Sequence, residues 1–154
     1  MTNTLILVFG PVAVAIVYSI YVMLWLEKQP AGNAKMQEIS KAIQEGSRAY
    51  LNRQSKTVGI VAAVLFVLIG LVLSWTTAIG FALGAIFSGL AAYLGMNVAV
   101  RSNAKSAEAA RKGMKASLSL AFKAGSVTGF LVVALGLLSV GGFFMATGDI
   151  KSLI

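Results

Sequence analysis

The sequence predicts an all-α membrane protein with four transmembrane helices. Only 12% of its 154 residues are charged and 58% are hydrophobic, whereas about a quarter of the residues are charged in an ordinary soluble domain. Three long blocks contain no Asp, Glu, Lys, Arg or His: residues 5–26, 57–100 and 124–148. A helix needs roughly 20 residues to cross the hydrocarbon core. The outer blocks therefore hold one span each, and the middle block holds two.

The whole chain, 1–154, is predicted to be a single membrane domain segment. The first apolar block is not typical of a signal peptide, because it lacks a basic start and a small-residue cleavage site and its apolar run is too long. The middle block is expected to turn near residues 74–77. The connections on the other side cover 27–56 and 101–123. The four spans are expected at about residues 5–26, 57–75, 78–100 and 124–146.

Positive charge is concentrated in the two connections. The chain has 13 Lys and Arg residues, and all but Lys151 lie in 27–56 or 101–123. With four spans, both connections lie on one side of the membrane, and the positive-inside rule predicts that this side is cytoplasmic and the N-terminus outside. We interpret the clusters as a topology signal with contacts to anionic lipid headgroups, and not as a nucleic-acid site.

Groups that usually carry catalysis are scarce. Cysteine and histidine are absent, and the five acidic residues all lie outside the predicted spans: Glu27, Glu38, Glu45, Glu108 and Asp149. An ion path normally needs an ionisable group at membrane depth. There is also no Asp-rich cluster for Mg²⁺ and no phosphate-binding loop motif. Taken alone, these residues describe a helix-packing membrane segment, and a stand-alone four-helix protein acting as an assembly or transporter subunit remains an alternative.

The first connection is predicted to be largely helical. Asn33 is a suitable N-cap, and apolar residues recur at three- and four-residue spacing after it. No helix breaker precedes Thr57, so the helix is expected to continue into the second span. This amphipathic part is expected either to extend toward a catalytic domain or to lie flat on the lipid surface. The second connection also has a helical composition.

Small residues recur along the third and fourth spans. They repeat every four residues at Gly80, Gly84, Ser88 and Ala92, and a second series contains Gly125, Gly129 and Gly136. Small side chains allow close approach of helices in lipid, where packing replaces the hydrophobic driving force. These two helices are therefore predicted to pack against other helices, and the small residues alone do not state whether those partners lie within this chain.

Three segments resemble conserved signatures of the membrane-bound, ion-translocating inorganic pyrophosphatases. They are IQEGSRAYLNR at residues 43–53, GMNVAVRSNAKSAEAA at 95–110 and AFKAGSVTGF at 121–130. Their order and spacing agree with the family's first four helices, and the resemblance covers essentially the whole chain. The departures from the family pattern are small: Ser47, Tyr50, Gln54-Ser55, Lys105-Ser106, Lys123-Ala124 and Thr128.

The resemblance implies that the chain is the N-terminal portion of a larger helical bundle. Family members hydrolyse Mg²⁺-pyrophosphate and drive H⁺ or Na⁺ out of the cytoplasm. By resemblance, the protein would be a homodimer in a prokaryotic cell membrane. Its Mg²⁺ would bind outside this segment, and these residues do not determine the pumped ion or any need for K⁺.

No catalytic, cofactor-binding or metal residue can be assigned from the resemblance, because the family's Asp-rich motifs lie on later helices. Six polar residues are candidates for supporting the cytoplasmic face near the hydrolytic site. Ordinary interfacial polar residues are an equally good interpretation of each. The candidates are Glu45, Arg48, Arg53, Asn97, Arg101 and Asn103.

Overall fold

The computed structural model describes residues 2–148, with side chains from residue 6 onward. Four helices make up nearly all of this range: α1 (Thr2–Glu27), α2 (Ala34–Val72), α3 (Trp75–Ala110) and α4 (Met114–Thr147). Each contains a stretch long and apolar enough to cross a membrane. The described residues include no strand. The predicted fold class, an all-α integral membrane protein, is confirmed.

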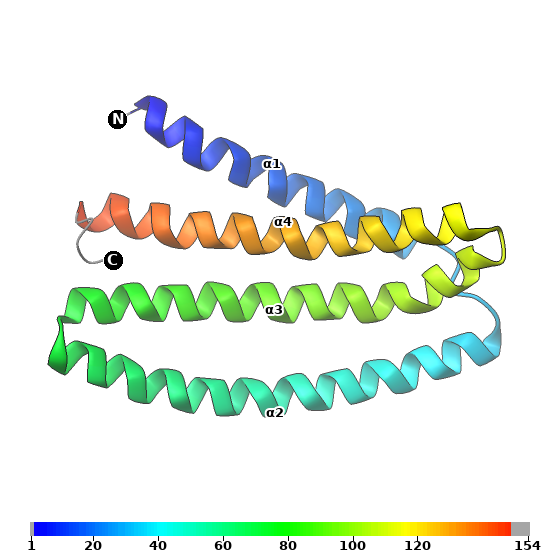
Figure 1. Cartoon of the computed structure of the whole chain (residues 1–154), viewed down its shortest axis with the longest axis horizontal. Helices are drawn as coiled ribbons and strands as arrows, with labels where there is room; N and C mark the ends of the chain where they lie inside the picture. The colour runs from blue at the N-terminus through cyan, green and yellow to red at the C-terminus, as the bar shows by residue number, and fades with distance from the viewer. Residues whose placement is uncertain (1, 149–154) are drawn as a thin grey trace.

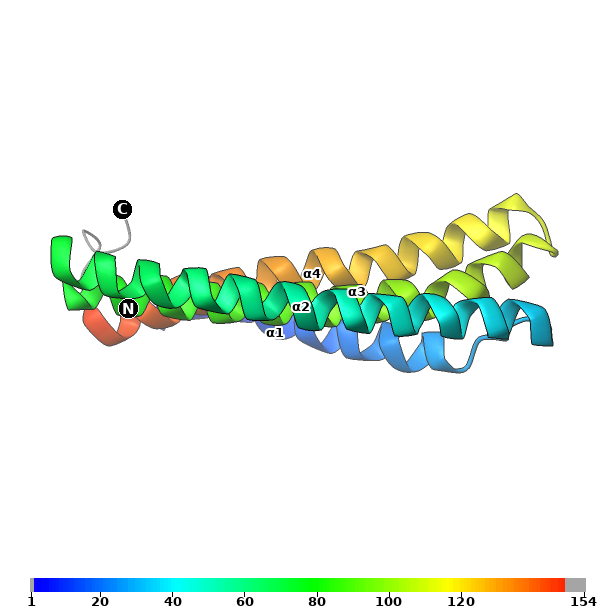
Figure 2. The ribbon, with the colours of Figure 1, turned by 90° about the horizontal axis from the view of Figure 1, so that it is seen from below.

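The four helices lie side by side in the order α1, α4, α3, α2 (Figure 1), and each neighbouring pair in this order is in contact. The α1–α2 and α3–α4 connections meet at one end of this layer, which we call the basic end and define as residues 27–56 and 101–123. The α2–α3 turn lies at the opposite end. Figure 2 shows that α2 runs along most of the length of the layer. The arrangement therefore leaves α1 and α2 as its two edges.

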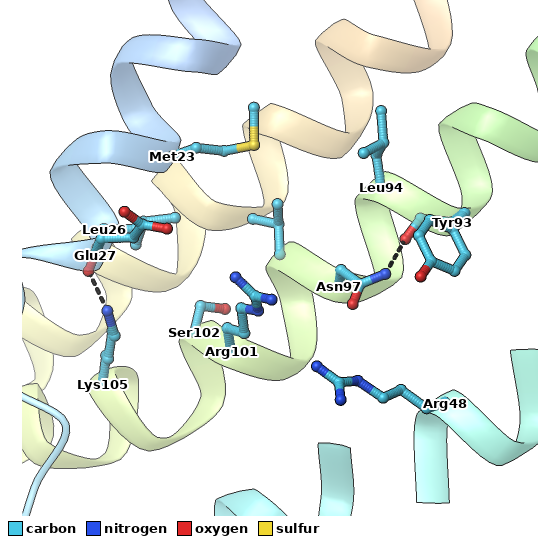
Figure 3. A pocket seen from close by; sticks show the side chains of 11 residues that line it. Met23, Leu26, Glu27, Arg48, Tyr93, Leu94, Asn97, Arg101, Ser102 and Lys105 are labelled. Atoms are coloured by element: carbon cyan, nitrogen blue, oxygen red, sulfur yellow. Dashed lines mark hydrogen bonds between the residues drawn. The ribbon is translucent and has the colours of Figure 1, made fainter. Parts of the chain in front are cut away.

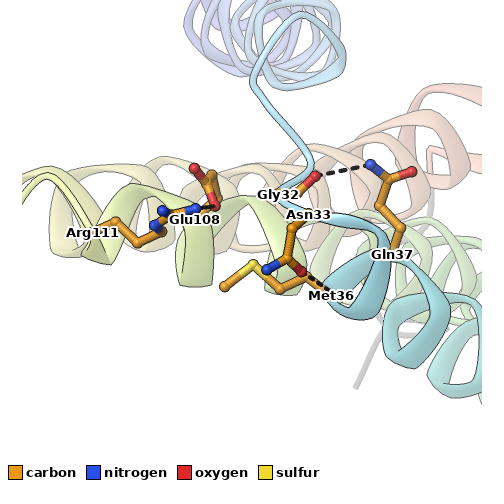
Figure 4. A network of polar contacts seen from close by, with 6 residues as sticks. All are labelled: Gly32, Asn33, Met36, Gln37, Glu108 and Arg111. Atoms are coloured by element: carbon orange, nitrogen blue, oxygen red, sulfur yellow. Dashed lines mark hydrogen bonds and ion pairs between the residues drawn. The ribbon is translucent and has the colours of Figure 1, made fainter.

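The link from α1 to α2 is held by local hydrogen bonds (Figure 4). Asn33 is the N-cap of α2, as predicted, and its side-chain oxygen accepts a hydrogen bond from the Met36 backbone N–H at 2.9 Å. The Gln37 side-chain amide donates to the Gly32 carbonyl at 2.9 Å. Gly32 has φ of 84°, a conformation that glycine adopts without steric cost. The link can therefore turn sharply between the two helices.

The turn between α2 and α3 lies slightly earlier than the sequence suggested. It was expected near residues 74–77, but α3 already begins at Trp75. Ser74 explains the difference, because its side-chain oxygen accepts a hydrogen bond from the Thr77 backbone N–H at 3.1 Å and caps the helix. The Trp75 ring then packs against Gly70 of α2.

Helix α2 runs without interruption from the basic end to this turn, as predicted. At 1.5 Å per residue, its 39 residues are about 58 Å long, or roughly twice the thickness of a hydrocarbon core. Its polar first half is therefore an extension of the apolar half. The structure does not support the alternative in which this half is a separate helix lying flat on the lipid.

Most of the buried apolar residues lie on α1, α3 and α4. One cluster joins Val22 and Leu26 of α1 to Val98 of α3 and to Leu120, Ala124, Val127 and Leu131 of α4. A smaller cluster contains Val12, Ala15 and Ala134. Tyr18 adds a hydrogen bond from α1 to Ser126 of α4, with 3.0 Å between the two oxygens. No residue of α2 belongs to either cluster.

The small-residue series are only partly used inside the chain. Gly80 faces the Phe143 ring of α4, and Gly84 lies near Ser139. The closest approach involves a glycine outside the predicted series: a Cβ added to Gly95 would lie 2.6 Å from Cγ2 of Thr128. The remaining members are exposed in this chain: Ser88, Ala92, Gly125, Gly129 and Gly136.

Candidate functional site

A cavity of about 330 Å³ opens at the basic end between α1, α2 and α3 (Figure 3). Helix α3 contributes most of its wall, α1 contributes its last turn, and α2 contributes one side chain. The lining residues are Met23, Leu26, Glu27, Arg48, Tyr93, Leu94, Asn97, Val98, Arg101, Ser102 and Lys105.

The α3 wall changes from apolar to cationic along the helix. Leu94, Asn97, Arg101 and Lys105 are three or four residues apart, so they share one face of α3. Leu94 lies nearest the middle of the layer, and Lys105 lies nearest the basic end. From the helix rise, about 16 Å separates these two positions along the axis. The cavity therefore has an apolar side and a cationic side.

Two guanidinium groups face the cavity without partners in the described part of the chain. Arg48 comes from α2 and Arg101 from α3 (Figure 3), and neither makes a hydrogen bond or an ion pair among the described residues. A guanidinium presents a rigid fork of donors that matches a carboxylate or a phosphate. This pair is therefore suited to binding an anionic group.

The third cation is Lys105, which is held against the end of α1. Its ammonium group donates a hydrogen bond to the Leu26 carbonyl in the last turn of that helix (Figure 3). A cation is favourable there because the C-terminal end of a helix carries partial negative charge. Glu27 is the only acidic residue that lines the cavity. Three cations and one carboxylate leave the cavity with an excess of positive charge.

The polar uncharged side chains of α3 are oriented by its own backbone. The Asn97 amide donates to the Tyr93 carbonyl at 2.8 Å, which leaves one amide hydrogen and the amide oxygen available. The Ser102 hydroxyl donates to the Ala99 carbonyl at 2.8 Å and is buried. Asn97 can therefore add a neutral contact to a ligand bound by the arginines.

A second, very small cavity links α2 and α3 directly. It is lined by Gln44, Ser47, Arg48, Asn97, Val100 and Arg101. These residues belong to two of the three signature segments, 43–53 and 95–110. The structure therefore brings two segments together that lie more than 40 residues apart in the sequence.

The six candidates from the sequence separate into two groups. Arg48, Asn97 and Arg101 line both cavities. Glu45, Arg53 and Asn103 are exposed and line neither. A role of any of the six in supporting a hydrolytic site remains a prediction.

Two charged residues of the site, Lys105 and Glu27, were not among the sequence candidates. Lys105 had a sequence signal, because it follows Asn97 and Arg101 at four-residue spacing on one face of a helix. Glu27 had none, since its position beside α3 depends on how α1 packs. The presence of Glu27 in the site is therefore decided by helix packing alone.

The acidic residues do not form a metal site in the part of the chain that the structure describes. No three Asp, Glu, His or Cys side chains lie close enough together to hold a metal ion between them. Mg²⁺ prefers carboxylate oxygens in an octahedral arrangement, so these residues do not fit it. The site can bind an anion, but we derive no metal-dependent or hydrolytic step from its side chains.

Comparison with known proteins relates the chain to one family. Residues 13–153 match the family described as inorganic H⁺ pyrophosphatase. A protein of Methanosarcina mazei named K(+)-insensitive pyrophosphate-energized proton pump is 42% identical over 79% of this chain. A protein of the same name from Caldanaerobacter subterraneus is 38% identical over 96% of it. A protein of Clostridium tetani, provisionally named K(+)-stimulated pyrophosphate-energized sodium pump, is 38% identical over 75% of it.

These relatives are much longer than the chain. The first two matches cover 18% and 23% of the relatives' own lengths, so the chain spans about a fifth of the proteins that it resembles. The family match nevertheless covers the second half of α1, the whole of α2, α3 and α4, and all the residues that line the cavity at the basic end. This chain belongs to the inorganic H⁺ pyrophosphatase family of membrane proteins.

Proposed function

We propose that this chain is the N-terminal segment of a membrane pyrophosphatase that couples hydrolysis of Mg²⁺-pyrophosphate to outward transport of H⁺ or Na⁺. The observation that carries this proposal is the family match over residues 13–153. Within the complete protein, the segment has a structural role and the chemistry belongs to other helices. Its own acidic residues do not fit a Mg²⁺ site, which supports placing the metal outside it.

The open helix layer supports this division of roles. Several small residues of α3 and α4 that could allow close helix contacts are exposed in the chain, such as Gly129 and Gly136. Small side chains make few contacts with lipid tails, but they let the backbone of another helix approach closely. Further helices of the same protein would use these positions. No observation favours the alternative of a self-contained subunit.

The decisive experiment uses the complete gene product in inverted membrane vesicles. Adding Mg²⁺-pyrophosphate should release phosphate and acidify the vesicle lumen, as followed by quenching of a pH-sensitive dye. If Na⁺ is the transported ion, its uptake should instead be measured with ²²Na⁺ in the presence of a protonophore. The isolated 1–154 chain should do neither. Absence of pyrophosphate hydrolysis by well-folded complete protein would contradict the proposal.

The orientation in the membrane is part of the proposal. We place the basic end in the cytoplasm and the N-terminus outside, because Lys and Arg accumulate on the cytoplasmic side of membrane proteins. The segment has no cysteine, so single cysteines can report its topology. In intact cells, a membrane-impermeant maleimide should label Thr76→Cys and should leave Lys112→Cys unlabelled until the cells are opened. The reverse pattern would overturn this orientation.

Two further properties are proposed from the family resemblance alone. The complete protein would be a homodimer in a prokaryotic cell membrane, and K⁺ would stimulate it only if residues outside this segment provide a site. Light scattering of the purified protein measures the first property. Hydrolysis rates with and without K⁺ measure the second.

A further inference from the structure

We propose that the cavity at the basic end binds the phosphate group of an anionic membrane phospholipid. This goes beyond the proposed pump activity and does not depend on it. Three features of the cavity favour this ligand: the unpartnered arginines, the change of polarity along its length and its size.

The charged side chains around the cavity are mainly positive. Arg48 and Arg101 approach the cavity from different helices, and neither has a hydrogen bond or an ion pair among the described residues. Lys105 lies beside them, and Glu27 offsets only part of their charge. Both arginines are exposed, so water already weakens the repulsion between them, and an anion bound between them would turn it into attraction. A phosphodiester can accept hydrogen bonds from both guanidinium groups and provides that negative charge.

The wall of the cavity changes from cationic to apolar along its length. The cations lie toward the basic end, and Met23 and Leu94 lie on the side toward the middle of the layer (Figure 3). A free anion would make no favourable contact with this apolar wall. A phospholipid matches both sides, because its phosphate lies at the membrane surface and its acyl chain extends inward. Met23 suits such a chain, since its flexible thioether adapts to irregular apolar surfaces.

The volume of the cavity also indicates the kind of ligand that it can hold. A cavity of about 330 Å³ lies within the range of small-ligand sites, about 300–1,000 Å³, and is much larger than one carboxylate needs. An acidic side chain from elsewhere in the protein would neutralise the arginines but would leave most of the apolar wall uncovered. A headgroup with the first part of an acyl chain fills both. A phospholipid is therefore the occupant that these observations favour.

The test measures lipid retention by the complete gene product. Protein in mild detergent is incubated with phosphatidylglycerol or with phosphatidylcholine of the same acyl chains, and bound lipid is counted by native mass spectrometry. The double substitution Arg48→Gln/Arg101→Gln should weaken phosphatidylglycerol binding by roughly tenfold or more, since it removes two charged hydrogen-bond donors. The matched control, Lys41→Gln/Arg53→Gln, removes two exposed cations of α2 outside the cavity and should change binding less than about twofold.

The outcomes separate the sources of the anion. Equal retention of both lipids by the unaltered protein, or equal losses in the two double variants, overturns the proposal. Displacement of phosphatidylglycerol by inorganic phosphate at millimolar concentration would show a site for free phosphate instead and also overturns it. Unchanged lipid retention in Arg48→Gln/Arg101→Gln, with or without a loss of thermal stability, likewise overturns the proposal.

A second measurement uses the unaltered protein and so does not depend on how a variant folds. Phosphatidylglycerol with a photoreactive group in its acyl chain is crosslinked, and the labelled residues are mapped by mass spectrometry. The proposal expects labels at Met23 or Leu94, with excess phosphatidylglycerol preventing them. Labels confined to other helix faces, such as exposed Val133 of α4, would contradict it.

Discussion

Helices α1 and α2 contain equally apolar membrane-spanning stretches, but these stretches pack in different ways. The most apolar windows of both have a mean hydropathy of 2.3. Helix α1 contributes buried residues along its length, including Val12, Ser19 and Leu26, and takes part in both apolar clusters. Helix α2 has 39 residues but buries only Ser40, Leu51 and Gly70, with none between residues 52 and 69.

Hydropathy therefore indicates that a helix resides in a membrane, but it does not indicate which helices pack against it. Both helices prefer hydrocarbon to water, and lipid tails satisfy that preference as well as another helix does. The shapes of the helix surfaces decide which helices pack together. Helix α1 packs against α4 through small and branched side chains. Within this chain, α2 contacts mainly α3. The following four substitutions test this contrast between the α1–α4–α3 packing and the α2 edge.

The largest effect is expected where α3 and α4 approach most closely. Gly95→Leu would place a Cβ 2.6 Å from Cγ2 of Thr128, a branched side chain that cannot easily move. Overpacking of this kind should cost about 3 kcal/mol of unfolding free energy. Unfolding in mixed detergent–SDS micelles measures it. The control Gly59→Leu faces open space on α2 and should change stability little. Equal losses of unfolding free energy in Gly95→Leu and Gly59→Leu would show that the α3–α4 contact is no more closely packed than the α2 edge.

The next effect comes from the main apolar cluster. Leu131→Ala should cost about 2 kcal/mol, because it leaves a cavity among packed side chains. Leu68→Ala on α2 removes the same atoms from a side chain that is 49% exposed, so its loss should stay below about 0.5 kcal/mol. The same unfolding assay compares the two variants. A larger loss for Leu68→Ala would show that α2 has partners that this helix layer lacks.

A smaller effect is expected at the α2–α3 turn. In Gly70→Ala the new Cβ would lie 2.8 Å from the Trp75 ring. This ring is half-exposed and can turn away, so the cost should be about 1 kcal/mol. In a Trp25→Phe background, Trp75 is the only tryptophan of the chain, and its fluorescence emission should shift. An unchanged spectrum together with unchanged stability would show that the ring does not pack on α2.

The smallest effect tests the polar contact between α1 and α4. Tyr18→Phe removes the hydrogen bond to Ser126, whose hydroxyl still donates to the Lys123 carbonyl at 2.7 Å. Because Ser126 keeps a partner, the loss should be only about 0.6 kcal/mol, a typical value between transmembrane helices. Tyr21→Phe changes an exposed ring of the same helix and should have no effect. Equal behaviour of the two variants would mean that this bond adds no stability.

The sequence predicted the elements of the fold because they depend on local properties. Length and hydropathy predicted four membrane helices, and side-chain chemistry predicted the cap at Asn33. The signature segments predicted the family. The same approach missed the start of α3 at Trp75, since Ser74 was not recognised as its cap.

Tertiary structure alone decided which of these surfaces meet. Gly95 lies against Thr128, whereas a Cβ added to Gly125 or Gly129 would meet no atom of another described helix within 4 Å, and nothing in the sequence distinguishes these glycines. Glu27 and Arg48 reach the α3 cavity only because α1 and α2 both pass α3 at the basic end. Periodicity describes one helix at a time. Contacts between helices depend on shape complementarity across residues that are distant in the sequence, and that information appears only when the chain is packed.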